Sequence, residues 1–256
     1  HLCDRRQRQM CIRDRYTIFW KDFYESFQKY FLPECERTFF VFTDDSNLSV
    51  YENVVKIEQE NLGWPYITLL RFDIFLSIEK QLKEYDYIYF FNANMLAMVT
   101  IGKEVLPSEQ QELTVVIHPW FYFQPRMKWT YDRNPQSKAY IPFNCGHYYV
   151  QGAFIGGTRA GFLRMCHVLS ARIQDDLKRD VIALWHDESH LNHYILNKSP
   201  LVLSPAYITA EGYFTPFDPK IVYLEKNSSR YGGIEYMRGL TDVPSCTIRS
   251  YQSSLE

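Results

Sequence analysis

The sequence predicts an α/β protein with a mostly parallel, mixed sheet flanked by helices. Short apolar runs bounded by turn residues recur along the chain, as in residues 38–43 and 85–91. Segments with helical spacing of apolar residues alternate with them, as in residues 16–31 and 160–180. The 256 residues are 46% hydrophobic, enough for one domain with a buried core. In such a fold, ligands gather at the carboxyl ends of the strands.

A stripe of aromatic side chains at spacings of three and four predicts the first helix, over residues 16–31, and Pro33 ends it. The remaining elements follow in order: strands at 38–43, 53–57, 85–91, 113–117 and 152–155, and helices at 67–82, 160–180 and 187–197. From Arg230 onward apolar residues are sparse, so residues 231–256 are interpreted as a loose tail.

Residues 1–15 differ from the rest of the chain. They hold five arginines and two cysteines without a helical or strand period. Residues 10–15 resemble a translated sequencing adapter, so we interpret residues 1–15 as an artefactual leader; a natural basic arm is the alternative. The predicted organisation is therefore a leader at 1–15, one domain at 16–230 and the tail.

The composition argues against several functions. Lys and Arg number 28 against 30 Asp and Glu, a net charge of −2, so binding to nucleic acid is not expected. A transmembrane segment is not expected either, because no run of about 18 apolar residues occurs. The six cysteines form no CxxC pair and are interpreted as free thiols. These features predict a cytoplasmic protein, with peripheral attachment to a membrane left open.

Two amides, Asn92 and Asn94, follow the apolar strand at residues 85–91 and share one face of its end. A divalent cation that holds a diphosphate prefers carboxylate ligands at such a place. Because amides bring no charge, the pair predicts a diphosphate site without metal. An ordinary polar turn is the alternative.

Residues 185–192, WHDESHLN, hold two acids and two histidines. A purely structural interpretation makes Asp187 a helix N-cap and places Glu188 in the first turn, near the positive end of the helix dipole. His186 and His190 have the spacing of a zinc helix, but a third ligand is not indicated, so metal is not expected.

Four stretches resemble glycosyltransferase family 6, the group of the blood-group A and B transferases and α-1,3-galactosyltransferase: residues 118–122, 131–142, 152–157 and 185–192. The resemblance extends from Tyr16 to Arg230. It implies a GT-A-like single domain and retaining transfer of galactose or N-acetylgalactosamine from a UDP-sugar. The acceptor implied is the 3-hydroxyl of a β-galactoside in an oligosaccharide, a fucosylated one being favoured, in α-1,3 linkage. Asn-Ala-Asn at 92–94 is similar to bacterial, metal-independent members, whereas animal members have Asp-Val-Asp.

The resemblance also implies roles for individual residues. Glu188 takes the place of the catalytic carboxylate, which stabilises positive charge on the reacting sugar. Ala153 narrows the space for an N-acetyl group and favours galactose, although both donors are retained. Residues expected to bind the donor are Tyr16, Arg71, Asn92, Asn94, Gln151, Gly152, Ala153, Asp187, Lys226 and Arg230. Residues expected to bind the acceptor are His118, Tyr140 and Trp185.

Two departures from the family pattern stand out. Members begin with a strand that contacts uridine, and here this first nucleotide-binding strand is expected to be missing behind the leader. Ala210 stands where animal members have an acid, which Glu211 would replace. The alternatives are a non-catalytic remnant that binds a sugar or nucleotide and a metal-dependent hydrolase built on His186, His190 and Asp187.

Overall fold

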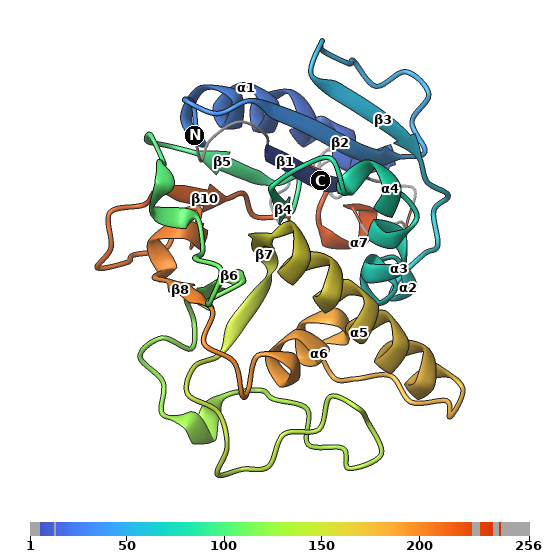
Figure 1. The fold of residues 1–256 in the computed structure, drawn as a ribbon, viewed down its shortest axis with the longest axis vertical. Coiled ribbons are helices and arrows are strands. Elements are labelled where there is room, and N and C mark those ends of the chain that lie inside the picture. Colours follow the sequence, from blue (N-terminus) through green and yellow to red (C-terminus); the bar gives the residue numbers. More distant parts are fainter. Residues whose placement is uncertain (1–5, 13, 227–230, 238–240, 242–256) are drawn as a thin grey trace, which may run out of the picture.

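The computed structural model describes residues 6–12, 14–226, 231–237 and 241. Its centre is a seven-stranded sheet (Figure 1). The strands lie in the order β3 Val54–Glu58, β2 Arg37–Thr43, β1 Arg6–Ile12, β4 Tyr87–Phe91, β7 Val150–Thr158, β6 Leu113–Ile117 and β8 Leu201–Leu203. Within this sheet β7 runs antiparallel to both neighbours, and the other pairings are parallel. The predicted α/β class with a mostly parallel, mixed sheet is confirmed.

The expectation that the first strand is missing is wrong. Residues 6–12 form β1, which pairs in parallel with β2 on one side and β4 on the other. Gln7, for example, is aligned with Thr38 in β2 and Ile88 in β4. A parallel ladder is made by backbone N–H and C=O groups, so it forms without the apolar alternation used to recognise strands in sequence. This pairing concerns the strand; the origin of residues 1–15 stays a prediction.

The predicted helices appear, with one exception. The first consists of η1 Asp14–Phe19 and α1 Trp20–Tyr30, and the two long ones are α5 Arg159–Leu177 and α6 His186–Tyr194. The continuous helix expected at 67–82 is divided into α2 Tyr66–Leu69, α3 Arg71–Leu76 and α4 Glu79–Leu82. Each of the three pieces still contributes buried side chains to one hydrophobic cluster, among them Ile67, Phe75 and Leu82.

Smaller elements complete the described part of the chain. A second sheet has the strand order β5 Met95–Ala97, β10 Ile221–Tyr223 and β9 Thr209–Ala210. The short helices are η2 Lys103–Val105, η3 Arg126–Lys128, η4 Pro205–Ile208 and α7 Ile234–Met237. β10 pairs with β5, which follows the two asparagines, so residues 221–223 are brought to the carboxyl end of β4.

The large sheet carries a hydrophobic core on each face. On one face, Phe39 of β2 and Phe91 of β4 pack in the cluster that contains the buried side of α1. On the other, Phe40 and Phe90 join the cluster formed with α3 and α5. Buried side chains thus alternate along strands covered on both faces, as expected for an α/β sheet.

The start of the tail predicted to be loose packs against the body of the protein. Tyr231 and Met237 are buried in the same cluster as α1, and the Tyr231 ring lies 4.6 Å from that of Phe19. These two apolar side chains gain more from burial than from exposure. Residues 242–256 lie outside the described part of the chain. In the part that is described, none of the helices has the length and apolar character needed to cross a membrane.

The aromatic core under α1 should dominate stability. Phe91 is fully buried, with its ring 4.8 Å from Phe27 and 4.5 Å from Phe154. We predict that Phe91→Ala lowers the free energy of unfolding by about 3–5 kcal/mol, because it leaves a cavity. Phe214, whose side chain is 97% exposed, is the matched control. Chemical denaturation measures both; equal losses for the two variants would contradict the packing described.

Candidate active site

The candidate site lies where the carboxyl end of β4 meets the first half of β7 and the start of α6. The Asn92 N–H donates to the Ala153 carbonyl at 3.0 Å, which ties the end of β4 to β7. The first turn of α6 lies against Gly152 of β7 and presents Asp187 and Glu188 there. Three segments far apart in sequence therefore place the predicted residues together.

Glu188 is half-buried and its carboxylate is held by two donors. The Tyr149 hydroxyl donates to Oε1 at 2.8 Å, and the Gly152 N–H donates to Oε2 at 2.9 Å. Burial raises the pKa of Glu188 to about 7, and neighbouring Asp187 adds to the rise, while the two hydrogen bonds and Arg71 oppose it. The group can thus be protonated or ionised near neutral pH.

Asp187 is buried and paired with Arg71. Arg71 Nη1 donates to Asp187 Oδ2 at 2.6 Å and to the Gly152 carbonyl at 2.7 Å. The guanidinium carbon lies 4.2 Å from the Phe90 ring centroid. Burial raises the pKa of Asp187 to about 6, against the opposing effect of Arg71. One positive and one negative charge are therefore buried together next to Gly152.

The N-cap interpretation of Asp187 is wrong. Helix α6 begins at His186, so Trp185 occupies the cap position and makes no side-chain cap hydrogen bond. The Trp185 N–H instead donates to Ser189 Oγ at 2.9 Å. Asp187 lies in the first turn, where its carboxylate reaches Arg71.

Asn192 fixes α6 to β7, a role that the sequence analysis missed. Its Nδ2 donates to the carbonyls of Val150 and Glu188, each at 2.9 Å, and its Oδ1 accepts from the Val150 N–H at 3.0 Å. Gly152 makes the close approach possible, since a Cβ there would lie 3.1 Å from Asp187 Oδ2 and 3.3 Å from Glu188 Cβ. Tyr149 was also missed, because nothing in its local pattern sets it apart from core tyrosines.

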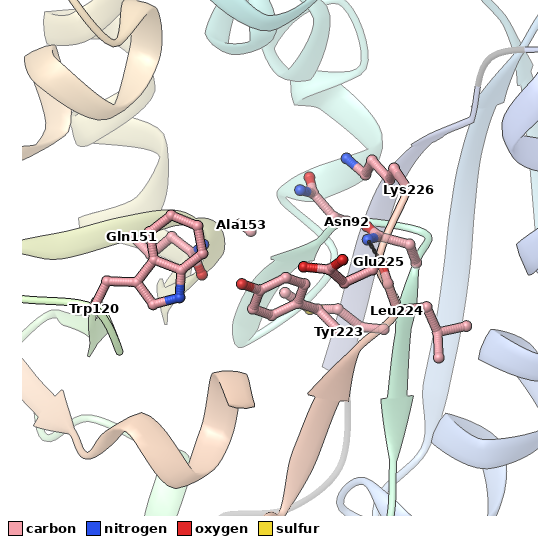
Figure 2. Close-up of a pocket in the computed structure, with 10 residues that line it drawn as sticks. Asn92, Trp120, Gln151, Ala153, Tyr223, Leu224, Glu225 and Lys226 are labelled. Carbon is pink, nitrogen blue, oxygen red and sulfur yellow. Dashed lines mark hydrogen bonds between the residues drawn. The ribbon is translucent and has the colours of Figure 1, made fainter. Parts of the chain in front are cut away.

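A cavity of about 250 Å³ opens beside this arrangement (Figure 2). Figure 2 shows Trp120 and Gln151 on one side and Tyr223, Glu225 and Lys226 on the other. The lining residues are Asn92, Asn94, Met95, Trp120, Gln151, Ala153, Tyr223, Leu224, Glu225 and Lys226. Five residues expected to bind the donor are thus brought together: Asn92, Asn94, Gln151, Ala153 and Lys226.

The cavity contains polar atoms without a protein partner. Asn94 Nδ2 donates to the Leu224 carbonyl at 2.7 Å, but Asn94 Oδ1 and Gln151 Oε1 are buried without a hydrogen bond within the described residues. Buried acceptors without donors are costly unless a ligand supplies them. A ligand rich in hydroxyl groups would do so. Glu225, whose position in the cavity the sequence did not reveal, adds a further acceptor.

The other predicted residues lie around the cavity or apart from it. Lys226 Nζ lies 4.9 Å from the Tyr16 ring centroid, which places Tyr16 near the cavity. Arg71, Asp187 and Glu188 are not among the lining residues; they contact or approach Gly152, which lies between the lining residues Gln151 and Ala153. The side chains of Tyr140 and Trp185 are exposed and do not line this cavity. Arg230 lies outside the described residues.

His118 lies next to the tyrosine that holds Glu188. The backbone N–H of His118 donates to the Tyr149 carbonyl at 2.8 Å, and its ring Nδ1 accepts from the Trp120 backbone N–H at 3.3 Å. Burial lowers the pKa of His118 to about 4, so the ring is neutral at physiological pH. A neutral imidazole whose Nδ1 is an acceptor carries its proton on Nε2, which can donate to a ligand.

The described residues include no group of three or more His, Cys, Asp or Glu side chains arranged to hold a metal ion. His190 is fully buried, and its Nε2 lies 3.7 Å from Asp176. The ligand set required for a hydrolase built on His186, His190 and Asp187 is therefore not assembled in this part of the chain.

Comparison with known proteins identifies the family of this chain. The profile described as "Glycosyltransferase family 6" matches residues 10–234. The chain is 36% identical to "O-antigen biosynthesis glycosyltransferase WbnI" of Escherichia coli over 225 residues, 86% of this chain and 94% of that protein. It is 31% identical to "Histo-blood group ABO system transferase 2" of Rattus norvegicus, over 76% of this chain and 60% of the relative. It is also 31% identical to "Globoside alpha-1,3-N-acetylgalactosaminyltransferase 1" of Mus musculus, over 81% and 62%.

The raised pKa of Glu188 makes the stability of the fold depend on pH. Because the folded pKa of about 7 exceeds the ordinary 4.5, the folded state holds this proton more tightly than the unfolded state. The resulting contribution to the free energy of unfolding is fully present below about pH 4.5 and is lost as pH rises through about 7. Glu188→Gln does not titrate, so its melting temperature should rise relative to the native protein over this interval, by about 2–4 °C per kcal/mol.

Thermal unfolding from pH 4 to 8 measures the difference between the two proteins. Glu84→Gln, at an exposed position, is the control for loss of a carboxylate as such. A Glu188→Gln difference that does not change with pH would show that burial does not perturb this carboxyl.

Proposed function

Because the chain belongs to glycosyltransferase family 6, we propose that it is a retaining transferase that moves galactose or N-acetylgalactosamine from a UDP-sugar to a β-galactoside. Membership makes it a glycosyltransferase of the hexosyltransferase kind, with a nucleotide-sugar donor and a glycan acceptor. The UDP donor, the 3-hydroxyl of a fucosylated acceptor and the α-1,3 linkage are the proposal. One relative's name specifies α-1,3 transfer of N-acetylgalactosamine, which supports it.

The observation that carries the proposal is that the Glu188 carboxylate is held in one orientation beside β7, the strand whose residues Gln151 and Ala153 line the cavity. Sugar transfer passes through a state with positive charge on the ring, and an oriented anion stabilises it. The Tyr149 hydroxyl and the Gly152 N–H orient the carboxylate before substrate arrives. As the bond between the anomeric carbon and the UDP oxygen breaks, UDP leaves with the bonding electrons and Glu188 faces the developing cation. The acceptor hydroxyl then forms the new bond to the anomeric carbon, and its proton passes to the departing diphosphate oxygen.

The cavity suits the donor. Lys226 supplies positive charge for the diphosphate, and the free acceptor atoms of Asn94 and Gln151 suit hydroxyl groups of the sugar. Asp187, neutralised by Arg71, completes the wall beside the sugar. The methyl group of Ala153 lines the cavity and narrows it, which favours galactose over the larger N-acetyl sugar. The names of the relatives include N-acetylgalactosaminyl transfer, so both donors are retained.

The non-catalytic alternative loses the observation that favoured it. A remnant was considered because the first strand was expected to be missing, whereas β1 is present and paired on both sides.

Cys145 and Cys166 are free thiols, which favours a reducing compartment, and on that ground we propose a cytoplasmic location.

We predict that transfer persists in EDTA and gains little from Mn²⁺. Asn92 and Asn94 stand at the strand end, where a pair of carboxylates would be needed to hold a hard cation against the diphosphate. Initial rates with UDP-galactose and lactose, with EDTA and after addition of Mn²⁺, measure this. A strict requirement for Mn²⁺ would show that Glu225 or other groups form a metal site.

Glu188→Gln tests the assigned chemistry. We predict that it keeps donor and acceptor binding but loses turnover by on the order of a hundredfold or more, because it removes the anion and keeps the shape. In the native protein, kcat should rise with pH through about 7 as the carboxyl ionises. Isothermal titration and steady-state kinetics separate binding from turnover. Near-normal kcat in a correctly folded variant would remove Glu188 from the mechanism.

A further inference from the structure

Residues 118–149 connect β6 to β7 and extend beyond the sheet, as the yellow-green segment at the bottom of Figure 1. This segment exposes large apolar side chains. Phe123 is 70% exposed, Met127 86% and Phe143 72%. Contiguous exposed groups of this kind on a folded protein indicate an interaction surface.

The exposed groups stand on an ordered frame. Arg126 Nη1 donates to the Asn144 carbonyl at 2.6 Å, which ties the turn around Met127 to the residue after Phe143. The guanidinium carbon of Arg133 lies 4.4 Å from the Phe143 ring centroid. On the other side, Phe123 stacks with Phe217, their centroids 6.3 Å apart. The backbone on either side of Met127 and Phe143 is thus tied together, and Phe123 lies four residues before Met127.

Buried carboxylates anchor the frame to the body of the protein. Asp132 accepts from the Leu184 N–H at 2.8 Å, just before α6. Asp176 of α5 accepts from the Ser137 hydroxyl and the Lys138 N–H, both at 2.8 Å to Oδ2. Residues 118–149, called here the anchored segment, are therefore fixed to the body of the protein while Phe123, Met127 and Phe143 remain exposed.

The charge of the segment is opposite in sign to that of the whole chain. It contains Arg126, Lys128, Arg133 and Lys138, and its one acid, Asp132, is buried, whereas the chain carries a net charge of −2. Lys138 pairs with Asp175, whereas Arg126 and Arg133 bond to backbone carbonyls and form no ion pair with the residues that the structure describes. Apolar tips flanked by cations are typical of proteins that insert into the headgroup region of anionic bilayers.

We propose that the anchored segment, residues 118–149, docks on a lipid bilayer that contains anionic phospholipid. Phe123, Met127 and Phe143 enter the interface, and Arg126 and Lys128 contact the headgroups. A second copy of the chain fits less well, because a symmetric contact would set these cations against their own copies. A soluble glycan would stack on flat rings, whereas Met127, the most exposed of the three, has none.

Docking has a consequence that rests on the proposed function. The anchored segment begins at His118, and Trp120 lines the cavity, so docking brings the active site close to the membrane surface. The acceptor favoured by this arrangement is a β-galactoside attached to a lipid in the bilayer. A water-soluble acceptor would gain nothing from it.

Sedimentation with vesicles tests docking without reference to activity. The native protein should bind vesicles of phosphatidylcholine with 30% phosphatidylglycerol (about one third anionic), less so at high salt, and bind pure phosphatidylcholine weakly. The triple variant Phe123→Ser, Met127→Ser, Phe143→Ser should lose roughly tenfold or more in partitioning for each group replaced. The control replaces exposed Val50, Met98 and Val99 by serine and should bind as the native protein does.

Absence of native binding to anionic vesicles, or equal loss in the control, would overturn the proposal. So would a native dimer in solution that only the triple variant dissociates, since that result identifies a second copy as the partner. Transfer to soluble lactose should be unchanged in the triple variant, while transfer to a vesicle-anchored lactosyl lipid falls. If neither acceptor is used by any variant, the proposed function fails, and the vesicle result still decides docking.

Discussion

The attachment of α6 to β7 is the constraint on which the candidate site depends. Asn192 binds the backbone of Val150 on both its N–H and its carbonyl, and Gly152 leaves room for the helix to approach. Through this contact two neighbouring carboxylates are placed against a strand in the interior of the protein. Without the partners supplied by β7 and Arg71, burial of these charges would be too costly for the fold.

The two carboxylates solve the same problem in different ways. Asp187 is neutralised by an opposite charge, Arg71, and so becomes a fixed polar wall. Glu188 receives neutral donors, from Tyr149 and Gly152, and keeps a pKa raised to about 7. A carboxylate held by neutral donors has no counter-ion, so in its ionised form its negative charge is available to a cationic partner that arrives later. Burial of Glu188 lowers the stability of the fold, and the same burial places the carboxylate where it would stabilise a cationic reacting sugar.

The residues of the candidate site and the exposed apolar residues lie in different parts of the fold. The sheet and α6 hold the reacting groups, while residues 118–149 are fastened by Asp132 and Asp176 and turn apolar side chains outward. His118 and Trp120 belong to the start of this segment and also to the surroundings of the cavity. Whatever the outer surface binds is thus brought next to the site that the inner residues form.

Local sequence patterns were sufficient for the α/β class, for strands β2, β3, β4, β6 and β7 and for the long helices, because spacing of apolar residues reflects the face that each element buries. Glu188 and the cavity asparagines were recognised from runs of residues that resemble one family. Tertiary structure alone decided the rest. The partner of Arg71 is 116 residues away, β1 forms by backbone pairing with two distant strands, and the helix expected at 67–82 is divided into three. These features depend on which segments meet in space, and a local pattern contains no record of that.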